Sequence, residues 1–172
     1  MRKGYVQVYT GNGKGKTTAA LGLALRAAGA GLTIFIAQFM KKEECSEHLL
    51  LAELSDRITV KQYGTGLIFN RKPSRRDIAV ARKGYDEVRR AIIEKEYDLV
   101  IMDEANVAAH LGLIPVQDLL DLIAAKPAGV ELVITGRYAD DRVMDAADLV
   151  TEMREIRHYH DKGVVARRGI EK

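Results

Sequence analysis

Residues 5–18 read YVQVYTGNGKGKTT, an apolar run followed by a stretch with three glycines, two lysines and three threonines. An apolar strand that enters a glycine-rich loop ahead of a helix is the context of a phosphate-binding P-loop, because glycines let backbone N–H groups face phosphate oxygens. The N-terminus of the helix expected over residues 16–28 adds partial positive charge. This order predicts that Lys16 contacts phosphates and that Thr17 offers its hydroxyl to Mg²⁺. Thr10 stands where the common motif has glycine, and the alternative interpretation is a glycine-rich turn that only caps a helix.

Short apolar runs alternate with helical patterns along the whole chain. Several runs are continuous rather than alternating, which is typical of strands that are covered on both faces in a parallel sheet. The pattern therefore predicts a doubly wound α/β fold with a mostly parallel sheet of about six strands and helices on both faces. The runs are residues 5–9, 32–39, 58–63, 99–102 and 132–135, with 149–150 a weaker sixth.

The clearest helix is expected from Ser74 to about Lys95, since Ser74 and Asp77 have the spacing of a capping box. Another helix is expected to start near Pro115. The longest loop, residues 64–73, exceeds a simple turn and is a candidate binding loop. The apolar stripe of the long helix is predicted at Ile78, Ala81, Tyr85, Val88 and Ile92.

Polar residues follow two of the other predicted strands. Asp103 and Glu104 come after one run, and a carboxylate there can hold Mg²⁺ directly or through water. Glu104 could instead be a base that activates water, as in ATPases. Arg137 follows another run, where it could clamp a phosphate or lie in solvent. Arg26 by itself looks like a helix-surface residue.

Composition narrows the function classes. The 172 residues carry 27 basic and 24 acidic side chains, a net charge of +3, which argues against a strongly polyanion-binding protein. Aromatic residues make up 6% and tryptophan is absent, which weakens any base-stacking surface for nucleic acid. No run approaches 18 apolar residues, so we expect no membrane partner and a cytoplasmic location.

Six blocks of the sequence carry a resemblance to a known family: residues 9–20, 38–39, 102–108, 131–137, 147–154 and 166–171. Over nearly its whole length, the sequence resembles the P-loop type of ATP:corrinoid adenosyltransferase. The last two of the matching blocks are not generic P-loop features, and Thr10 is itself a trait of that family. The resemblance implies a single RecA-like P-loop domain over residues 1–172, which transfers the 5′-deoxyadenosyl group of ATP to the Co(I) centre of a reduced corrinoid and releases triphosphate.

The resemblance also implies the site residues, with ATP as co-substrate and Mg²⁺ or Mn²⁺ as cofactor. The catalytic residues are then Lys16, Thr17 and Glu104, and the metal contacts are Thr17, Asp103 and Glu104. The implied ATP contacts are Gly11, Asn12, Gly13, Lys14, Gly15, Lys16, Thr17, Thr18, Arg26 and Arg137.

The corrinoid is expected to meet Leu67 and Phe69, where many family members carry Phe and Trp; ordinary loop anchoring is the alternative. The basic run 71–76 either meets corrinoid side-chain groups or a partner, or forms a solvated face. The resemblance further implies a homodimer and an electron donor such as a flavoprotein. Many members have an N-terminal cover over the active site, and we expect it here to be absent or supplied otherwise.

Two other function classes stay open on the residues. A RecA-like ATPase acting on nucleic acid would share the P-loop and the acidic strand end, and would use Glu104 as a base. A non-catalytic regulatory protein would bind ATP without turning over any corrinoid.

Overall fold

The computed structural model describes residues 3–42, 46–54, 56–66, 68 and 71–171. Its centre is a six-stranded sheet in the order β3-β2-β4-β5-β1-β6, and every neighbouring pair is parallel. The α/β class predicted from the sequence is thereby confirmed. The strands are β1 (Val6–Thr10), β2 (Ile34–Phe39), β3 (Ile58–Tyr63), β4 (Leu99–Asp103), β5 (Glu131–Thr135) and β6 (Leu149–Glu152).

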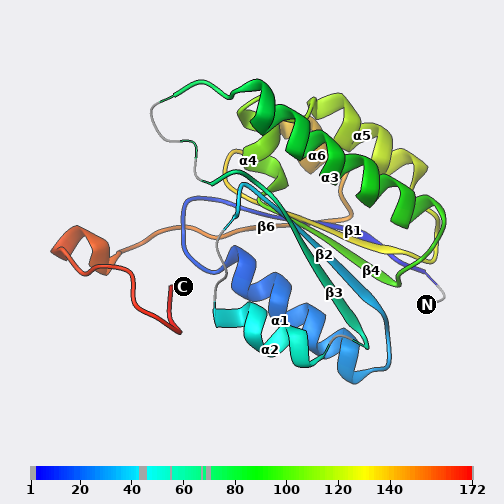
Figure 1. The fold of residues 1–172 in the computed structure, drawn as a ribbon, viewed down its shortest axis with the longest axis horizontal. Coiled ribbons are helices and arrows are strands. Elements are labelled where there is room, and N and C mark those ends of the chain that lie inside the picture. Colours follow the sequence, from blue (N-terminus) through cyan, green and yellow to red (C-terminus); the bar gives the residue numbers. More distant parts are fainter. Residues whose placement is uncertain (1–2, 43–45, 55, 67, 69–70, 172) are drawn as a thin grey trace.

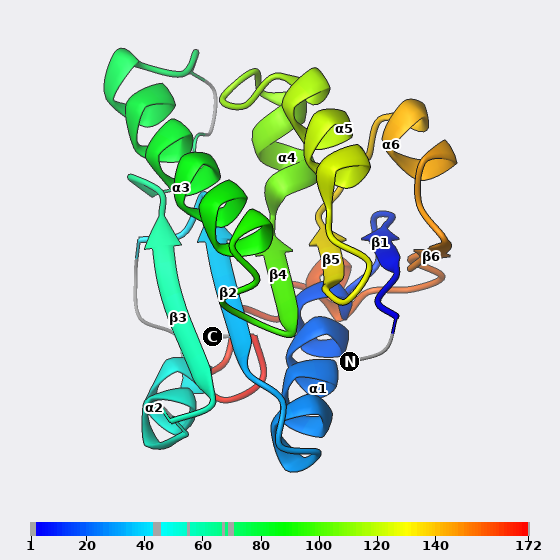
Figure 2. The same ribbon diagram turned by 90° about the vertical axis from the view of Figure 1, so that its right-hand side faces the viewer.

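Helices cover both faces of the sheet (Figures 1 and 2). Figure 1 shows α1 and α2 below the sheet and α3 to α6 above it. The helices are α1 (Lys16–Gly29), α2 (Ser46–Glu53), α3 (Arg75–Ile93), α4 (Ala105–His110), α5 (Val116–Ala125) and α6 (Asp141–Asp145), followed by a 3₁₀ turn, η1 (Tyr159–Lys162). Among the described residues, no helix has the length and apolar character needed to cross a membrane.

The core consists of two apolar layers, one on each face of the sheet. Along β2, Ile34 and Ile36 pack against α1 on one face of the sheet. Phe35 and Phe39 belong to the layer between the other face and helices α3 and α5. All six residues of β2 are buried, which explains why five of them are apolar; the sixth is Gln38. The edge strand β6 is exposed throughout, and this accounts for its weaker sequence signal.

The start of α3 confirms the predicted capping box and corrects the predicted apolar stripe. The Ser74 hydroxyl accepts a hydrogen bond from the Asp77 backbone N–H, and the Asp77 carboxylate accepts one from the Ser74 backbone N–H. Ile78 was expected in the core, but 43% of it is exposed. Asp77 takes the buried position in this first turn, because its carboxylate is held by Ser74 and by Arg71.

Candidate active site

The glycine-rich loop, residues 11–15, has a conformation that depends on its glycines. Gly11 and Gly15 have φ angles of 94° and 120°, a region that L side chains rarely adopt. The loop also lies against Met153, just after β6: the Gly13 N–H donates to the Met153 carbonyl oxygen over 2.6 Å. A Cβ at Gly13 would lie 2.7 Å from that oxygen. Glycine is therefore needed both for the turn and for the close approach of this segment.

The loop ends at a helix N-terminus suited to an anion. Gly15 is the N-cap of α1 and provides no side-chain cap, and the first turn holds no acidic residue. The first N–H groups of the helix therefore keep their capacity to bind phosphate oxygens. Lys16 lies at the same point, buried, and its Nζ donates to the carbonyl oxygens of Gly11 and Gly13 over 2.7 Å each. Burial lowers the pKa of Lys16, whereas Glu104 nearby opposes that change.

Asp103, at the end of β4, is the centre of a buried hydrogen-bond network. Its Oδ1 accepts from the hydroxyls of Thr17 and Thr135, both over 2.8 Å. Its Oδ2 accepts from Gln38 Nε2 over 3.2 Å and forms an ion pair of 2.9 Å with Lys41 Nζ. The network thus joins α1 to the carboxyl ends of β2, β4 and β5. Four donors use the acceptor capacity of this carboxylate.

Glu104 lies beside this network but is held differently. Its φ of 60° is left-handed, and its backbone N–H donates to Thr135 Oγ1 over 3.1 Å. No hydrogen bond to its carboxylate is found among the residues that the structure describes. Burial, helped by the neighbouring Asp103 charge, raises the pKa of Glu104, and Lys41 is the largest opposing influence.

These oxygen donors fit a magnesium ion that is shared with a phosphate ligand. Mg²⁺ is usually held by one or two carboxylates together with waters and substrate phosphates. Because Asp103 is already saturated, Thr17 and Glu104 are the groups with remaining capacity, and Asp103 orients Thr17. Within the described part of the chain, no cluster of three or more His, Cys, Asp or Glu side chains forms an all-protein metal cage.

The remaining implied ATP contacts lie at different places. Asn12 and Thr18 are exposed on the loop and on the first turn of α1. Arg137 is exposed after β5, close enough to influence the pKa of Lys16 and of Glu104. Arg26 is exposed in the last turn of α1, about 15 Å along the helix from Lys16. An ATP molecule that contacts both Lys16 and Arg26 would have to lie along α1.

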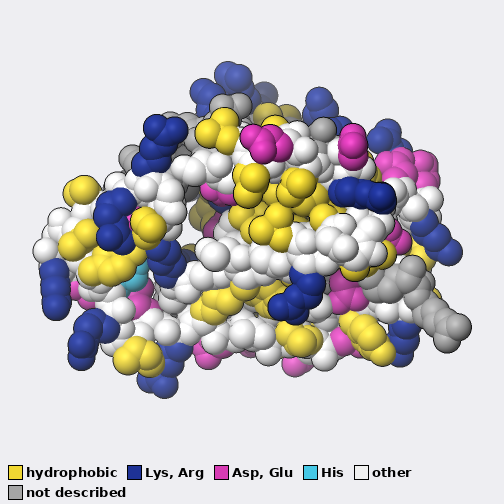
Figure 3. Space-filling model, turned by 90° about the horizontal axis from the view of Figure 1, so that it is seen from below, with side chains coloured by type: hydrophobic (Ala, Val, Ile, Leu, Met, Phe, Trp, Pro, Cys, Tyr) yellow, Lys and Arg dark blue, Asp and Glu magenta, His cyan; other side chains and the backbone are white. Residues whose placement is uncertain are grey.

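The side chain of Lys14 contacts the C-terminal segment, residues 153–171. Its Nζ donates to Tyr159 Oη and to the Ile170 carbonyl oxygen, both over 3.0 Å. The segment forms a separate lobe beside the body of the molecule, with hydrophobic side chains among Lys and Arg (Figure 3). Ile156 and Val165 in this lobe are 82% and 76% exposed. The two residues predicted to meet the corrinoid, Leu67 and Phe69, lie outside the described residues.

Sequence reasoning missed several residues that build this site. Lys41 pairs with Asp103, Thr135 bonds to both Asp103 and Glu104, and Met153 supports the glycine-rich loop. Lys41 and Thr135 lie at or just after the carboxyl end of a parallel strand, the edge where ligands bind in this class of fold. That rule could have identified both, whereas nothing local to Met153 indicates its contact with the loop.

Comparison with known proteins gives consistent matches. A family model described as ATP:corrinoid adenosyltransferase BtuR/CobO/CobP matches residues 2–171. A corrinoid adenosyltransferase of Pseudomonas aeruginosa is 32% identical over 170 residues, covering 98% of this chain and 84% of that protein. A corrinoid adenosyltransferase of Escherichia coli K12 is 31% identical over 169 residues, covering 98% and 86%.

Proposed function

This chain belongs to the ATP:corrinoid adenosyltransferase family, and we propose that it transfers the 5′-deoxyadenosyl group of ATP to the Co(I) centre of a reduced corrinoid, releasing triphosphate. The observation that carries the proposal is the uncapped N-terminus of α1, with Lys16 buried beside it and Thr17 tied to Asp103. That arrangement suits the binding of a triphosphate group, which is the leaving group of this reaction.

In this reaction the protein mainly has to position the two reacting atoms and to stabilise the charge on the leaving group. The Co(I) electron pair attacks the C5′ carbon of ATP, a cobalt–carbon bond forms, and the C5′–O bond breaks. Its electron pair leaves with triphosphate, and the cobalt becomes formally Co(III). Co(I) is already a strong nucleophile, so Glu104 is assigned to metal binding rather than to base catalysis. In-line placement of the two reacting atoms supplies much of the rate enhancement.

The loop residues would stabilise charge on the leaving group. Lys16 is oriented by the carbonyl oxygens of Gly11 and Gly13, which leave one of its N–H bonds for a phosphate oxygen. Backbone N–H groups of the loop and of the first turn of α1 add fixed donors. When bound between Thr17 and Glu104, Mg²⁺ would supply further neutralisation of the triphosphate. Arg137 would reach the same group from β5.

The corrinoid must approach from the other end of ATP, so the nucleotide is proposed to lie reversed relative to a kinase. In that direction the adenosine extends beyond the loop, and Arg26 at the far end of α1 would contact it. Leu67 and Phe69 are proposed to lie under the corrin ring, where apolar side chains would displace the lower axial ligand. Removal of that ligand makes Co(II) easier to reduce by an electron donor, for which a flavoprotein is proposed.

The proposal is tested by incubating the protein anaerobically with ATP, Mg²⁺ and a chemically reduced corrinoid. We expect the spectrum of an adenosylcorrinoid together with triphosphate. ADP and phosphate as the only products would contradict the proposal and favour an ATPase. A cytoplasmic homodimer is also proposed, and sedimentation with and without ATP tests the dimer.

A further inference from the structure

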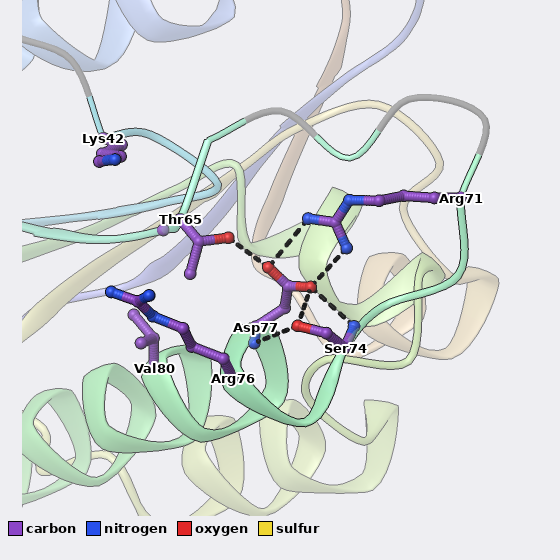
Figure 4. A pocket seen from close by; sticks show the side chains of 8 residues that line it. Lys42, Thr65, Arg71, Ser74, Arg76, Asp77 and Val80 are labelled. Atoms are coloured by element: carbon purple, nitrogen blue, oxygen red, sulfur yellow. Dashed lines mark hydrogen bonds and ion pairs between the residues drawn. The ribbon is translucent and has the colours of Figure 1, made fainter.

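A cavity of about 290 Å³ opens beside the N-terminus of α3, apart from the glycine-rich loop (Figure 4). Its walls come from the segment after β2, the segment after β3, and the start of α3 with the residues just before it. Lys42, Thr65 and Arg76 come from these three elements and all line it. In Figure 4, Lys42 lies on one side of the cavity, and Arg76 runs over Val80 on the other. Three separate parts of the chain therefore build one pocket.

The cavity carries excess positive charge because its acidic residue is already used. Asp77, which is 4% exposed, accepts from Arg71 Nη1 over 2.6 Å and Arg71 Nη2 over 3.1 Å. The hydroxyls of Ser74 and Thr65 also donate to this carboxylate. The charges of Arg71 and Asp77 thus neutralise each other. Lys42 and Arg76 have no acidic partner among the described residues.

A short stretch of chain links one wall of the cavity to the site around Asp103. A Cβ at Gly64 would lie 2.4 Å from the Met40 carbonyl carbon and 2.6 Å from the Lys41 backbone nitrogen, so the segment after β3 lies directly against the end of β2. Lys41 then reaches Asp103 over 2.9 Å. Since β1 and β3 are four strand positions apart, the cavity is about 19 Å from the glycine-rich loop along the same edge of the sheet.

We propose that Lys42 and Arg76 bind an oxyanion on the periphery of the corrinoid, a carboxylate or a phosphate, while the ring lies between this cavity and the nucleotide. This inference rests on the proposed function and extends that function by naming the class of corrinoid. Guanidinium and ammonium groups form charge-assisted hydrogen bonds with carboxylate and phosphate oxygens, and an uncharged amide replaces these poorly. The protein therefore favours corrinoids with anionic side groups over the fully amidated, phosphate-free form.

The experiment compares three corrinoids with the whole protein: cobyrinic acid a,c-diamide with free carboxylates, cobalamin with its phosphodiester, and uncharged, phosphate-free cobinamide. Arg76→Gln, Lys42→Gln and the double variant are measured for kcat and KM with pre-reduced corrinoid. Arg75→Gln is the matched control, since Arg75 lies in the same helical turn and does not line the cavity. Equilibrium dialysis of each corrinoid against each variant without ATP gives affinities that do not depend on turnover.

We expect each cavity variant to raise KM for at least one anionic corrinoid about threefold, and the double variant about tenfold, with kcat little changed. The same variants should change KM for cobinamide less than twofold, and Arg75→Gln should have the KM values of the wild type. A loss confined to cobyrinic acid a,c-diamide identifies carboxylates as the ligand, and a loss confined to cobalamin identifies the phosphate. Equal losses for cobinamide, or no loss in dialysis and kinetics, would overturn the inference. Wild-type protein that binds corrinoid selectively but forms no adenosylcorrinoid would refute the proposed function alone.

Discussion

Lys14 of the glycine-rich loop forms a salt bridge with Glu171, near the end of the chain, over 2.8 Å between Nζ and Oε1. With Tyr159 Oη and the Ile170 carbonyl oxygen, Glu171 completes three acceptors for this ammonium group. Arg167 bonds to Glu171 as well. The C-terminal segment is thereby fastened to the loop that is proposed to hold triphosphate, and a phosphate that recruits Lys14 must compete with Glu171.

Glu171→Gln should strengthen ATP binding. The variant removes the negative charge that competes for Lys14 and keeps the size of the side chain. Because the pair is exposed, we expect only a two- to fivefold lower dissociation constant. Titration calorimetry with tripolyphosphate and with ATP measures this dissociation constant. Asp161→Asn is the control, since Asp161 is an exposed acidic residue of the same segment. Unchanged or weaker binding would show that Lys14 does not exchange Glu171 for phosphate.

Lys16→Ala should reduce adenosyl transfer by at least a hundredfold in kcat. The ammonium group is proposed to stabilise charge on the leaving triphosphate, an effect of the same kind as the loss of an oxyanion-hole donor. Single-turnover kinetics with pre-reduced corrinoid measure the chemical step directly. Thermal unfolding must be followed in parallel, because Lys16 also ties Gly11 to Gly13. A folded Lys16→Ala protein with wild-type turnover would refute the assignment of the loop.

Glu104→Gln should raise the Mg²⁺ concentration for half-maximal activity about tenfold, since one of two proposed metal contacts becomes neutral. Its stability should be close to wild type, because the carboxylate has no hydrogen-bond partner in the described part of the chain. Asp103→Asn is the informative comparison. That variant should lower the free energy of unfolding, since an amide NH₂ would face donors from Gln38 and Lys41. Equal Mg²⁺ dependence in Glu104→Gln and wild type would exclude Glu104 as a ligand.

Acid should weaken the start of α3 through Asp77. The Arg71 guanidinium, followed by hydrogen bonds from Ser74 and Thr65, holds the pKa of this carboxyl far below its usual range. A depressed pKa adds stability that is fully present above the unfolded pKa of about 3.9 and is lost as pH falls below it. Urea unfolding at several pH values should show that the stability gap between wild type and Asp77→Asn is constant from pH 7 to 5 and narrows below about pH 4. A gap independent of pH would contradict this account.

The sequence was most informative where periodicity and local chemistry agree. The apolar run at β2, interrupted only by Gln38, and the Ser74–Asp77 spacing at α3 each specify one local structure, and both predictions are confirmed. The helix α4 starts directly after Glu104 and has only six residues, and α6 has only five, so neither is long enough to show a helical periodicity of apolar residues. The contact of Met153 with Gly13 depends on which strand lies beside β1, and no local signal contains that information.

The central claim is that cobalt attacks C5′ and that the C5′–O bond breaks. The direct measurement uses ATP with ¹⁸O in the oxygen that bridges C5′ and the α-phosphorus, in a single anaerobic turnover with reduced corrinoid. Mass spectrometry should find the label in triphosphate, in an amount equal to the adenosylcorrinoid formed. Label retained on adenosine, or recovered in ADP with release of inorganic phosphate, would contradict the account.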